Sequence, residues 1–491
     1  MNQALRRVSL ACLVMFLLLL VNANFVQAFQ ANKLASDPGN GRTFAQQYQY
    51  QRGAIITADN KVIAESKNVG GIYSYQRAYP DPLPYASVTG YDTPYSATGI
   101  EQAENKLLAG TDPRLTVRNL IDLVTGKPKK GATVQLTINS AAQQAAYDAL
   151  KATGHPGGAV AIDPSTGAIL ALASYPSFNP NKLATFDGKA LNQADRKYLS
   201  APGQPLVNKA INQTFPPGST FKIVTSSAAF STGKYTAQTP YDAPTNLKLP
   251  DTTNQLINFD NEPCGSGGKV PLIYAFTVSC NTVFGGLGMH LGGSVLRHQA
   301  NRFGMNRSLR IPLPVSPSSY PPVSNPAYTA YSAIGQYNDA VTPLQEAMFA
   351  AAIANGGTLM RPYMVQKVIA PNLSALVATK PTVLSQAVSP KVADQVKQMM
   401  AAVVSNPIGT AHATAYIPGL PIAAKTGTAQ NGINNTGLDD AVFSCFAPVG
   451  NPQIAVGVVV KGGGLGADAS APVAVKIIKA YMGYLASQAK R

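Results

Sequence analysis

The sequence of 491 residues contains no tryptophan, four histidines and four cysteines, and only 13% of its residues are charged. The histidines stand apart from one another, and no His or Cys cluster has the spacing of metal ligands, so we expect no metal centre and no cofactor. No run of Lys or Arg exceeds two residues and no nucleic-acid motif occurs, which argues against nucleic acid as a partner. The formal net charge of +16 suits another anionic neighbour, such as a phospholipid surface or a polyanionic wall.

One long hydrophobic run is present, at the N-terminus. Arg6 and Arg7 precede an apolar stretch over residues 8–29, which is long enough to cross about 30 Å of hydrocarbon. The two arginines place residues 1–7 in the cytoplasm and the rest of the chain outside. A cleaved signal peptide is the alternative, because Val26-Gln27-Ala28 has the small-residue spacing that a signal peptidase accepts.

The cysteines follow from that placement, because an extracytoplasmic space permits disulfides. Cys12 lies in the apolar run, where we expect it to be inert. Cys264, Cys280 and Cys445 allow three pairings. The closeness of Cys264 and Cys280 in sequence makes their disulfide a hypothesis, while Cys445, in an apolar strand-like run, is interpreted as a buried thiol.

Strand-like segments stand at both ends of a long region whose middle is mostly helical. Apolar runs of strand length cover 159–162, 168–173, 423–429, 442–446 and 454–460. Helical patterns cover 140–151, 219–233, 272–286, 342–355 and 472–485, and six prolines make 311–326 a loop. We therefore expect an α/β domain whose sheet joins the two ends of this region.

Three short motifs occur in order: Ser219-Thr-Phe-Lys222, Ser279-Cys-Asn281 and Lys425-Thr-Gly427. Each is weak alone, since Ser-x-x-Lys recurs at Ser487 and Ser-x-Asn recurs at Ser177. The second occurrences lie in the last residues of the chain and in a Pro-rich turn. Ser219 differs from them because it follows Pro-Pro-Gly and opens a predicted helix.

The first motif suits nucleophilic catalysis. Residues i and i+3 share a helix face, so the Lys222 amine can reach the Ser219 hydroxyl. A lysine acts as a base when burial or a second cation lowers its pKa, and Lys425 supplies that cation. The exposed N–H groups of a first helical turn favour developing negative charge. No Gly-x-Ser-x-Gly elbow surrounds Ser219, which argues against a Ser-His-Asp hydrolase.

The ordered trio and its surroundings resemble the class B penicillin-binding proteins, particularly their actinobacterial members. The resemblance runs from about residue 50 to 485 and rests on the three motifs together with the following stretches: Phe215-Pro-Pro-Gly218, Ala424 with Thr428-Ala429, Ile334-Gly335-Gln336, Thr342-Pro343-Leu344-Gln345, Asp163-Pro-Ser-Thr-Gly167, Ser174-Tyr-Pro-Ser-Phe-Asn179, Arg52-Gly53 and Thr98-Gly-Ile-Glu101.

The resemblance implies an α+β protein. A penicillin-binding transpeptidase domain of the serine β-lactamase-like type, with a five-stranded sheet flanked by helices, is expected over residues 132–491. A smaller non-catalytic α+β domain, of the class B pedestal or dimerisation type, is expected over 30–131. A transmembrane anchor over 8–29 and a cytoplasmic tail over 1–7 precede them, which places a single-pass protein in the cytoplasmic membrane with its catalytic domain outside.

The resemblance also implies the chemistry. Ser219 forms an acyl-enzyme with the penultimate D-Ala of a peptidoglycan stem peptide, and a second stem-peptide amine then makes the cross-link. Lys222 is the general base, Ser279 relays the proton toward the leaving amine, and Asn281 holds the substrate amide and Lys222. Lys425 supplies fixed positive charge. β-Lactams are expected to acylate Ser219 as covalent inhibitors.

The segment after Lys425 is expected to bind substrate. The hydroxyls of Thr426 and Thr428 bind the terminal carboxylate, and Gly427 lets the strand approach closely. The backbone N–H groups of Ser219 and Thr428 form the oxyanion hole. The family usually carries an aromatic residue, often Trp, in the neighbouring strand, whereas this chain has Asp439-Asp440-Ala441-Val442-Phe443 there. The sequence therefore does not identify the residue that forms this wall of the site.

Other activities share the trio. A β-lactamase needs a deacylating group such as a water-positioning Glu, and none is evident. A D,D-carboxypeptidase uses water as the acceptor, and a catalytically silent β-lactam-binding scaffold would share the fold. A bifunctional class A protein is disfavoured because no Glu-Asp glycosyltransferase signature is found. Class B enzymes work beside a membrane glycosyltransferase of the shape, elongation or division type, which is the expected partner.

Overall fold

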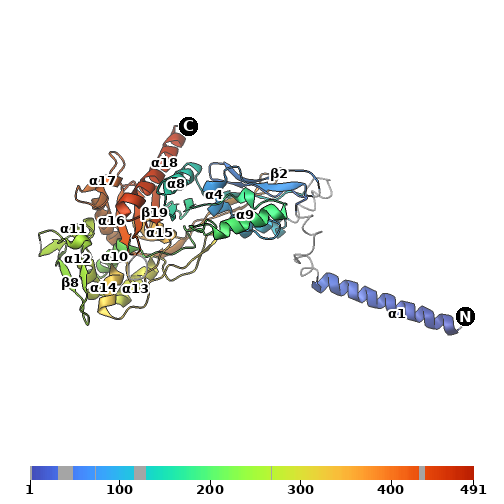
Figure 1. The fold of residues 1–491 in the computed structure, drawn as a ribbon, viewed down its shortest axis with the longest axis horizontal. Helices are drawn as coiled ribbons and strands as arrows, with labels where there is room; N and C mark the ends of the chain where they lie inside the picture. Colours follow the sequence, from blue (N-terminus) through green and yellow to red (C-terminus); the bar gives the residue numbers. More distant parts are fainter. Residues whose placement is uncertain are drawn as a thin grey trace.

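The computed structural model describes residues 3–30, 48–71, 73–115, 129–266, 268–430 and 437–490. Beyond the N-terminal helix the chain folds into one body, in which a small sheet region lies beside a larger helical region (Figure 1). Within the expected N-terminal domain, the stretches 31–47 and 116–128 lie outside the described residues. Residues 1–2 of the expected tail also lie outside them.

The N-terminal helix is long and apolar. Helix α1 (Gln3–Phe25) continues into a π-helical segment, η1 (Val26–Gln30), and the 28 residues have a mean hydropathy of 2.3 in their most apolar window, of which nothing is buried. At 1.5 Å per residue, 28 residues extend about 42 Å, more than the roughly 30 Å of a bilayer core. By length and composition the helix can therefore cross a membrane.

The catalytic half is built on a five-stranded antiparallel sheet in the order β17–β18–β19–β5–β6. The strands are β5 (Gly157–Ile162), β6 (Ile169–Tyr175), β17 (Ala423–Ala429), β18 (Asp440–Ala447) and β19 (Ile454–Val460). The register pairs Gly457 with Val160, so the last strands of the chain continue the first ones. The expected five-stranded sheet joining both ends of the region is confirmed.

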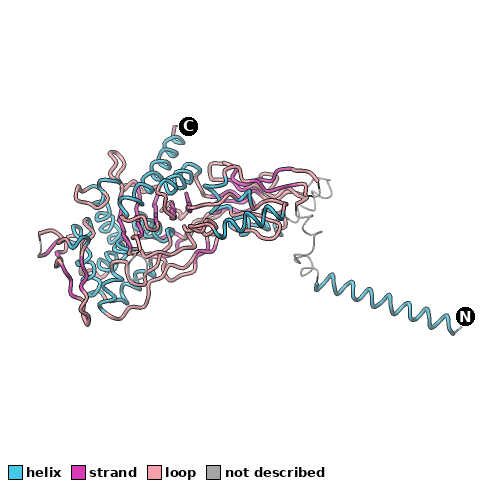
Figure 2. The backbone as a smooth tube through the Cα atoms, in the orientation of Figure 1, coloured by secondary structure: helices cyan, strands magenta, loops and turns pink. Residues whose placement is uncertain are grey.

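Helices cover both faces of this sheet (Figure 2). Helices α8 (Ser140–Ala152) and α18 (Ala471–Ala489) pack on each other and against the sheet. Helix α15 (Pro343–Ala354), which is buried along its whole length, packs against β5, β18 and β19. Local chemistry sets where these helices begin: the side chain of Asn139 accepts from Ala142 N, and that of Thr342 accepts from Gln345 N.

Two helix predictions need correction around the predicted motifs. The pattern over 272–286 forms two helices, α11 (Leu272–Thr277) and α12 (Asn281–Leu291), because the chain turns at Ser279, whose φ is 61°. The predicted helix from Ser219 starts as a 3₁₀ turn, η4 (Gly218–Phe221), before α10 (Lys222–Ser231). Ser219 therefore lies on a tighter turn than an α-helix.

A second sheet combines both halves of the chain. Its order is β15–β14–β4–β1–β2–β3, with β1 and β4 parallel and the other neighbours antiparallel. The strands are β1 (Ile55–Ile56), β2 (Val62–Asn68), β3 (Tyr75–Ala78), β4 (Thr133–Leu136), β14 (Val365–Ile369) and β15 (Ala375–Ala378). Because β14 and β15 come from the catalytic half, backbone hydrogen bonds tie the small N-terminal region to it.

The remaining elements are short helices and hairpins. The helices are α4 (Pro82–Thr89), α5 (Gly99–Ala103), α6 (Asn105–Leu108), α9 (Gly188–Ser200), α13 (Gly293–Arg302), α14 (Pro326–Ala333), α16 (Pro390–Ser405) and α17 (His412–Ala415), with short turns η2 (Pro113–Leu115), η3 (Pro180–Lys182), η5 (Phe259–Asn261) and η7 (Gly466–Ser470). The paired strands are β7 (Pro240–Asp242) with β10 (Lys269–Pro271), β8 (Asn246–Lys248) with β9 (Gln255–Ile257), β11 (Leu309–Arg310) with β12 (Pro314–Val315), and β13 (Thr358–Met360) with β16 (Val383–Gln386).

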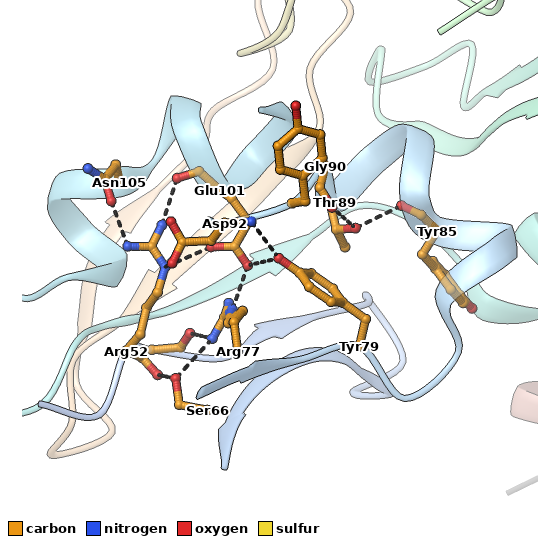
Figure 3. Close-up of polar contacts among 12 residues, drawn as sticks. Arg52, Ser66, Arg77, Tyr79, Tyr85, Thr89, Gly90, Asp92, Glu101 and Asn105 are labelled. Carbon is orange, nitrogen blue, oxygen red and sulfur yellow. Dashed lines mark hydrogen bonds and ion pairs between the residues drawn. The ribbon is translucent and has the colours of Figure 1, made fainter. Parts of the chain in front are cut away.

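A buried ionic cluster holds the N-terminal region together (Figure 3). Glu101, with no exposed surface, accepts from Arg52 Nε at 2.7 Å and from Arg77 Nε at 2.6 Å. Burial acts to raise the pKa of Glu101, but Arg77 and Arg52 outweigh it and hold that pKa below its usual value. Arg52 donates further to Asn105 Oδ1 and Glu101 O, and Arg77 Nη1 donates to Gly53 O, so the cluster links the segment before β1 with β3, α5 and α6.

We expect the Glu101→Gln variant to lose about 3–5 kcal/mol of unfolding free energy, because it leaves the buried Arg77 without its counter-charge and Arg52 with only Asp92, at 3.7 Å. Asp81→Asn is the matched control: Asp81 pairs with Lys61 at 2.8 Å, but both side chains are about one-third or more exposed, so its loss should be at most about 1 kcal/mol. Urea unfolding of the two variants measures the difference. Equal losses would contradict the structural role assigned to the cluster.

Candidate active site

A cleft of about 850 Å³ opens beside the edge strand β17. Its lining includes Ser219 from η4, Ser279 and Asn281 from the turn between α11 and α12, and Thr426 and Thr428 from β17. Lys222 and Lys425 contact the same turn but are completely buried. The three motifs predicted from sequence therefore converge at one place.

The turn that carries Ser219 depends on two glycines. Gly218 has φ of 55°, a conformation that favours glycine. Its N–H donates to Gly335 O at 2.9 Å, and a Cβ on Gly335 would lie only 2.0 Å from Gly218 O. The Ile334-Gly335-Gln336 stretch noted in the sequence therefore packs closely against the Ser219 turn.

The two lysines meet at one hydroxyl. Lys222 Nζ lies 3.2 Å from Ser279 Oγ, and Lys425 Nζ donates to the same oxygen at 2.8 Å. Lys222 Nζ also donates to Ser279 O at 2.8 Å and to Asn281 Oδ1 at 2.7 Å. Among the described residues, no side-chain hydrogen bond joins Lys222 to Ser219, so the amine is held by the second motif beside the nucleophile turn.

Burial changes the acid–base behaviour of both amines. It is the main cause that brings the pKa of Lys222 well below its usual value, and the neighbouring Lys425 lowers that pKa further. Burial alone lowers the pKa of Lys425 to about 7. Each amine also lies 5.5 Å from the centre of an aromatic ring, Phe284 for Lys222 and Phe276 for Lys425, which stabilises whichever amine is charged.

The turn at Ser279 is fixed from outside by two links. The structure joins Cys264 and Cys280 by a disulfide with a Cα–Cα distance of 6.0 Å, while Cys445 is a buried free thiol. Asn258, which is 6% exposed, accepts from the N–H groups of Asn281 and Thr282 at 2.8 and 3.0 Å. Asn258 therefore caps α12 where that helix presents Asn281.

Strand β17 forms one side of the cleft. A Cβ on Gly427 would come within 2.8 Å of Pro217 O and 3.1 Å of Thr220 Cγ2, so glycine is needed where the strand meets the Ser219 turn. Thr426 Oγ1 lies 2.7 Å from Thr410 Oγ1, and both threonines line the cleft. The hydroxyls of Thr410, Thr426 and Thr428 provide a polar surface for a carboxylate.

The wall that the sequence left open is formed by other residues. Phe443 faces Thr426 across the β17–β18 register but is fully buried and does not line the cleft. Asp439, Leu465 and Gly466 lie on that side instead. Leu465, 37% exposed, supplies apolar surface next to β17.

Asn258 and Thr410 were missed by the sequence analysis. Neither belongs to a recognisable motif, and Asn258 precedes the helix it caps by more than twenty residues, so no spacing rule identifies it. The described residues contain no group of three or more His, Cys, Asp or Glu side chains arranged to hold a metal ion.

Comparison with known proteins gives two family matches. Residues 157–482 match the penicillin-binding protein transpeptidase domain, and residues 52–134 match the penicillin-binding protein A dimerisation domain. Together the two matches cover both sheets of the structure.

Individual relatives and solved structures agree with these two family matches. The chain is 43% identical to the peptidoglycan D,D-transpeptidase PbpA of Mycolicibacterium smegmatis over 94% of each chain. It is 40% identical to that of Mycobacterium tuberculosis over 98% of this chain and 99% of the relative. The ceftriaxone and penicillin G acyl-enzyme complexes of M. tuberculosis penicillin-binding protein A align with TM-scores of 0.86 and 0.84, both at 38% identity; they cover 89% and 88% of this chain and 99% and 100% of those chains.

We expect the Asn258→Ala variant to react with a fluorescent penicillin about 10-fold more slowly, because the loss of about 1–2 kcal/mol of cap energy frees the segment that holds Asn281 and Lys222. The control is Asn254→Ala, four residues earlier and exposed. Rates of covalent labelling measure the effect. If both variants label at the wild-type rate, Asn258 does not position the site.

Proposed function

The chain belongs to the class B penicillin-binding proteins, and on that premise we propose how its residues carry out the reaction of the family. It is a serine-type peptidoglycan D,D-transpeptidase that β-lactams acylate. The observation that carries the assignment is the convergence of Ser219, Lys222, Ser279, Asn281 and Lys425 from three segments of the chain on one cleft.

Acylation begins at Ser219. Neutral Lys222 takes the proton from Ser219 Oγ, which attacks the carbonyl carbon of the penultimate D-Ala of a stem peptide. Burial and Lys425 both favour the neutral amine, since both lower the pKa of Lys222. The backbone N–H groups of Ser219 and Thr428 stabilise the oxyanion; a Cβ on Gly218 would lie 2.8 Å from Thr428 O, so the two backbones are adjacent.

The proton then returns to the leaving group. Ser279 Oγ contacts both amines, so it can pass a proton from Lys222 to the amine of the departing D-Ala while Lys425 donates to it. Asn281 holds Lys222 through Oδ1; one N–H of its Nδ2 donates to Ile257 O at 3.2 Å, and the other orients the peptide. A second stem-peptide amine attacks the ester, forms the cross-link and restores Ser219.

Substrate is held along β17. The Thr426 and Thr428 hydroxyls donate to the terminal carboxylate of the substrate. Lys425 supplies positive charge nearby, and Gly427 allows the strand to approach closely. A β-lactam places its own carboxylate there, and its opened ring keeps the leaving amine attached to the ester. We assign catalysis to residues 132–491 and a pedestal role to residues 30–131.

A water-activating carboxylate of the β-lactamase type is not supported by the geometry around Ser219. The glutamate that contacts the neighbouring Thr220, Glu346, is completely buried and bonded to the Thr220 hydroxyl. It has no access to the water that would hydrolyse the ester. The transferase reading is thus favoured over the hydrolase.

We further propose that α1 stays in the cytoplasmic membrane, with Arg6 and Arg7 on the cytoplasmic side and the catalytic cleft outside. Its length and hydropathy support this anchor. An anchored transpeptidase works on strands made at the same membrane. The partner that fits is a membrane glycosyltransferase of the shape, elongation or division type, which supplies the uncross-linked glycan.

We expect wild-type protein to be labelled covalently by fluorescent penicillin and the Ser219→Ala variant to remain unlabelled. Ser487→Ala is the matched control, because Ser487 begins the other Ser-x-x-Lys sequence and is exposed at the C-terminal end of α18. The label should decay slowly, because Glu346, the glutamate in contact with the nucleophile turn, is buried and bonded to Thr220. Persistent labelling of Ser219→Ala would sink the assignment, and rapid release from wild type would favour hydrolysis.

The anchor has a separate test. We expect a form in which residues 1–30 are replaced by a cleaved secretion signal to be released from membranes and labelled by penicillin at the wild-type rate, because the cleft does not involve α1. It should fail to replace the anchored protein in supporting cell-wall growth. Cell fractionation and growth complementation measure this. Full complementation by the released form would contradict the proposed need for a membrane-bound partner.

A further inference from the structure

One buried acid has no part in the reaction described above. Glu346 on α15 is 0% exposed, and its Oε2 has no hydrogen-bond partner among the described residues. The ion pairs found in the described part of the chain do not include it. A charged carboxylate in such a place would be strongly destabilising, because burial removes its water and supplies no cation.

The contacts of Thr220 indicate the protonation state of this acid. Thr220 Oγ1 lies 2.8 Å from Pro217 O and 2.8 Å from Glu346 Oε1. A hydroxyl has a single proton, so it donates to only one of these oxygens. If Glu346 were ionised, Thr220 Oγ1 would donate to one of these oxygens and would face the other with no proton between the two atoms. If Glu346 is the neutral acid, its O–H donates to Thr220 Oγ1 and Thr220 donates to Pro217 O.

The residue bonded to Glu346 is part of the nucleophile turn. Thr220 follows Ser219 in η4, and Pro217 O and Thr220 Cγ2 are the atoms against which Gly427 of β17 packs. Gly218 meets the backbone of Thr428 in the same way. The hydrogen bond from Thr220 to Pro217 therefore closes the turn that sets Ser219 N and Ser219 Oγ relative to the substrate strand.

The sheet makes room for this acid. A Cβ on Gly457 of β19 would lie 2.7 Å from the Cβ of Glu346, so glycine at that strand position leaves space for the side chain. Ser444 Oγ of β18 donates to Glu346 O at 2.8 Å. The backbone of α15 is thus held at this residue independently of the carboxyl group.

We propose that Glu346 is a positioning residue for acylation: as the neutral acid it donates to Thr220 Oγ1 and so keeps the Pro217–Thr220 turn closed beneath Ser219. The inference deepens the proposed function, since it concerns the same nucleophile. When Glu346 loses its proton, the Thr220 hydroxyl turns to the carboxylate, the bond to Pro217 O is lost, and acylation slows.

The surroundings of Glu346 agree with this chemistry. Burial raises the pKa of Glu346 to about 8. The elements that pack against α15 or the turn contribute few titratable groups: Asp440 and Cys445 on β18, and Lys391, Asp394 and Lys397 on α16, while β5, β13, β19 and η4 contribute none. Lys222 and Lys425 lie nearby on α10 and β17, and Glu346 is not among the causes that shift the pKa of either amine.

The test compares the full-length wild type with Glu346→Gln. The amide donates to Thr220 at every pH, so Glu346→Gln should acylate at the wild-type rate at pH 7. One pH unit above a pKa of about 8 leaves about a tenth of the acid protonated, so at pH 9 the variant should be about 10-fold faster than wild type. The ratio of the two rates, measured with fluorescent penicillin from pH 6 to 9.5, cancels the titration of Lys222 and Lys425, which both proteins share.

Two further variants separate the hydrogen bond from general stability. Thr220→Val should acylate slowly at pH 7 and show no further loss of rate above pH 8, because it removes the hydroxyl and keeps the shape of the side chain. Ser444→Ala should still lose rate above pH 8 as wild type does, because it removes only the bond to the Glu346 backbone. The inference is overturned if the Glu346→Gln and wild-type profiles superimpose, or if Glu346→Gln is slow at every pH. Absence of labelling in wild type would instead overturn the proposed function itself.

Thermal unfolding gives a readout that does not depend on acylation. The usual pKa of Glu346 is 4.5 and that in the folded protein is about 8, so between these pH values the folded protein keeps a proton that the unfolded chain releases. Stability of wild type therefore falls relative to Glu346→Gln as pH rises from about 5 to about 8, and the difference levels off above that window. A difference in Tm that does not change with pH would overturn the neutral-acid assignment.

Discussion

The site depends on two lysine amines held in a dry place within hydrogen-bond distance of one serine hydroxyl. Lys222 and Lys425 are fully buried, yet Ser279 Oγ contacts both. Two charges there would repel each other without water to screen them, so the pair favours one neutral and one charged amine. In the proposed mechanism, the neutral amine is the base for Ser219 and the charged amine is the cation for the substrate carboxylate. The disulfide, the Asn258 cap and the close glycine contacts hold in place the segments that surround these amines.

The rest of the fold supports that arrangement from two directions. The five-stranded sheet presents β17 at its edge, and α15 stands behind the strands with Glu346 reaching the nucleophile turn. In the second sheet β14 pairs with β4, and β4 pairs in turn with β1. With the cluster around Glu101 at the other end of that sheet, the N-terminal region is joined to the C-terminal region by hydrogen bonds.

Much of this was predictable from sequence because it rests on local patterns. Apolar runs and turn residues identified the strands of the five-stranded sheet, and the ordered motifs named residues that the structure brings together at the cleft. Sequence reasoning failed where distant residues decide. The break at Ser279 requires a positive φ that no propensity favours for serine, and it is stabilised by Asn258 and Cys264. The pairing of β14 with β4 and the contact of Glu346 with Thr220 join segments with no local signal in common.

The antiparallel pairing of Val160 with Gly457 also constrains how the molecule forms. A chain that crosses a membrane from its N-terminus delivers β5 and β6 long before β19, β18 and β17 arrive. Until then β5 has an open edge, and contacts between such distant segments form slowly. The last strands complete the sheet and the cleft in one event. On the proposed membrane topology, the sheet and the cleft stay incomplete until β17, β18 and β19 have emerged, and β5 is open to wrong edge pairing until then.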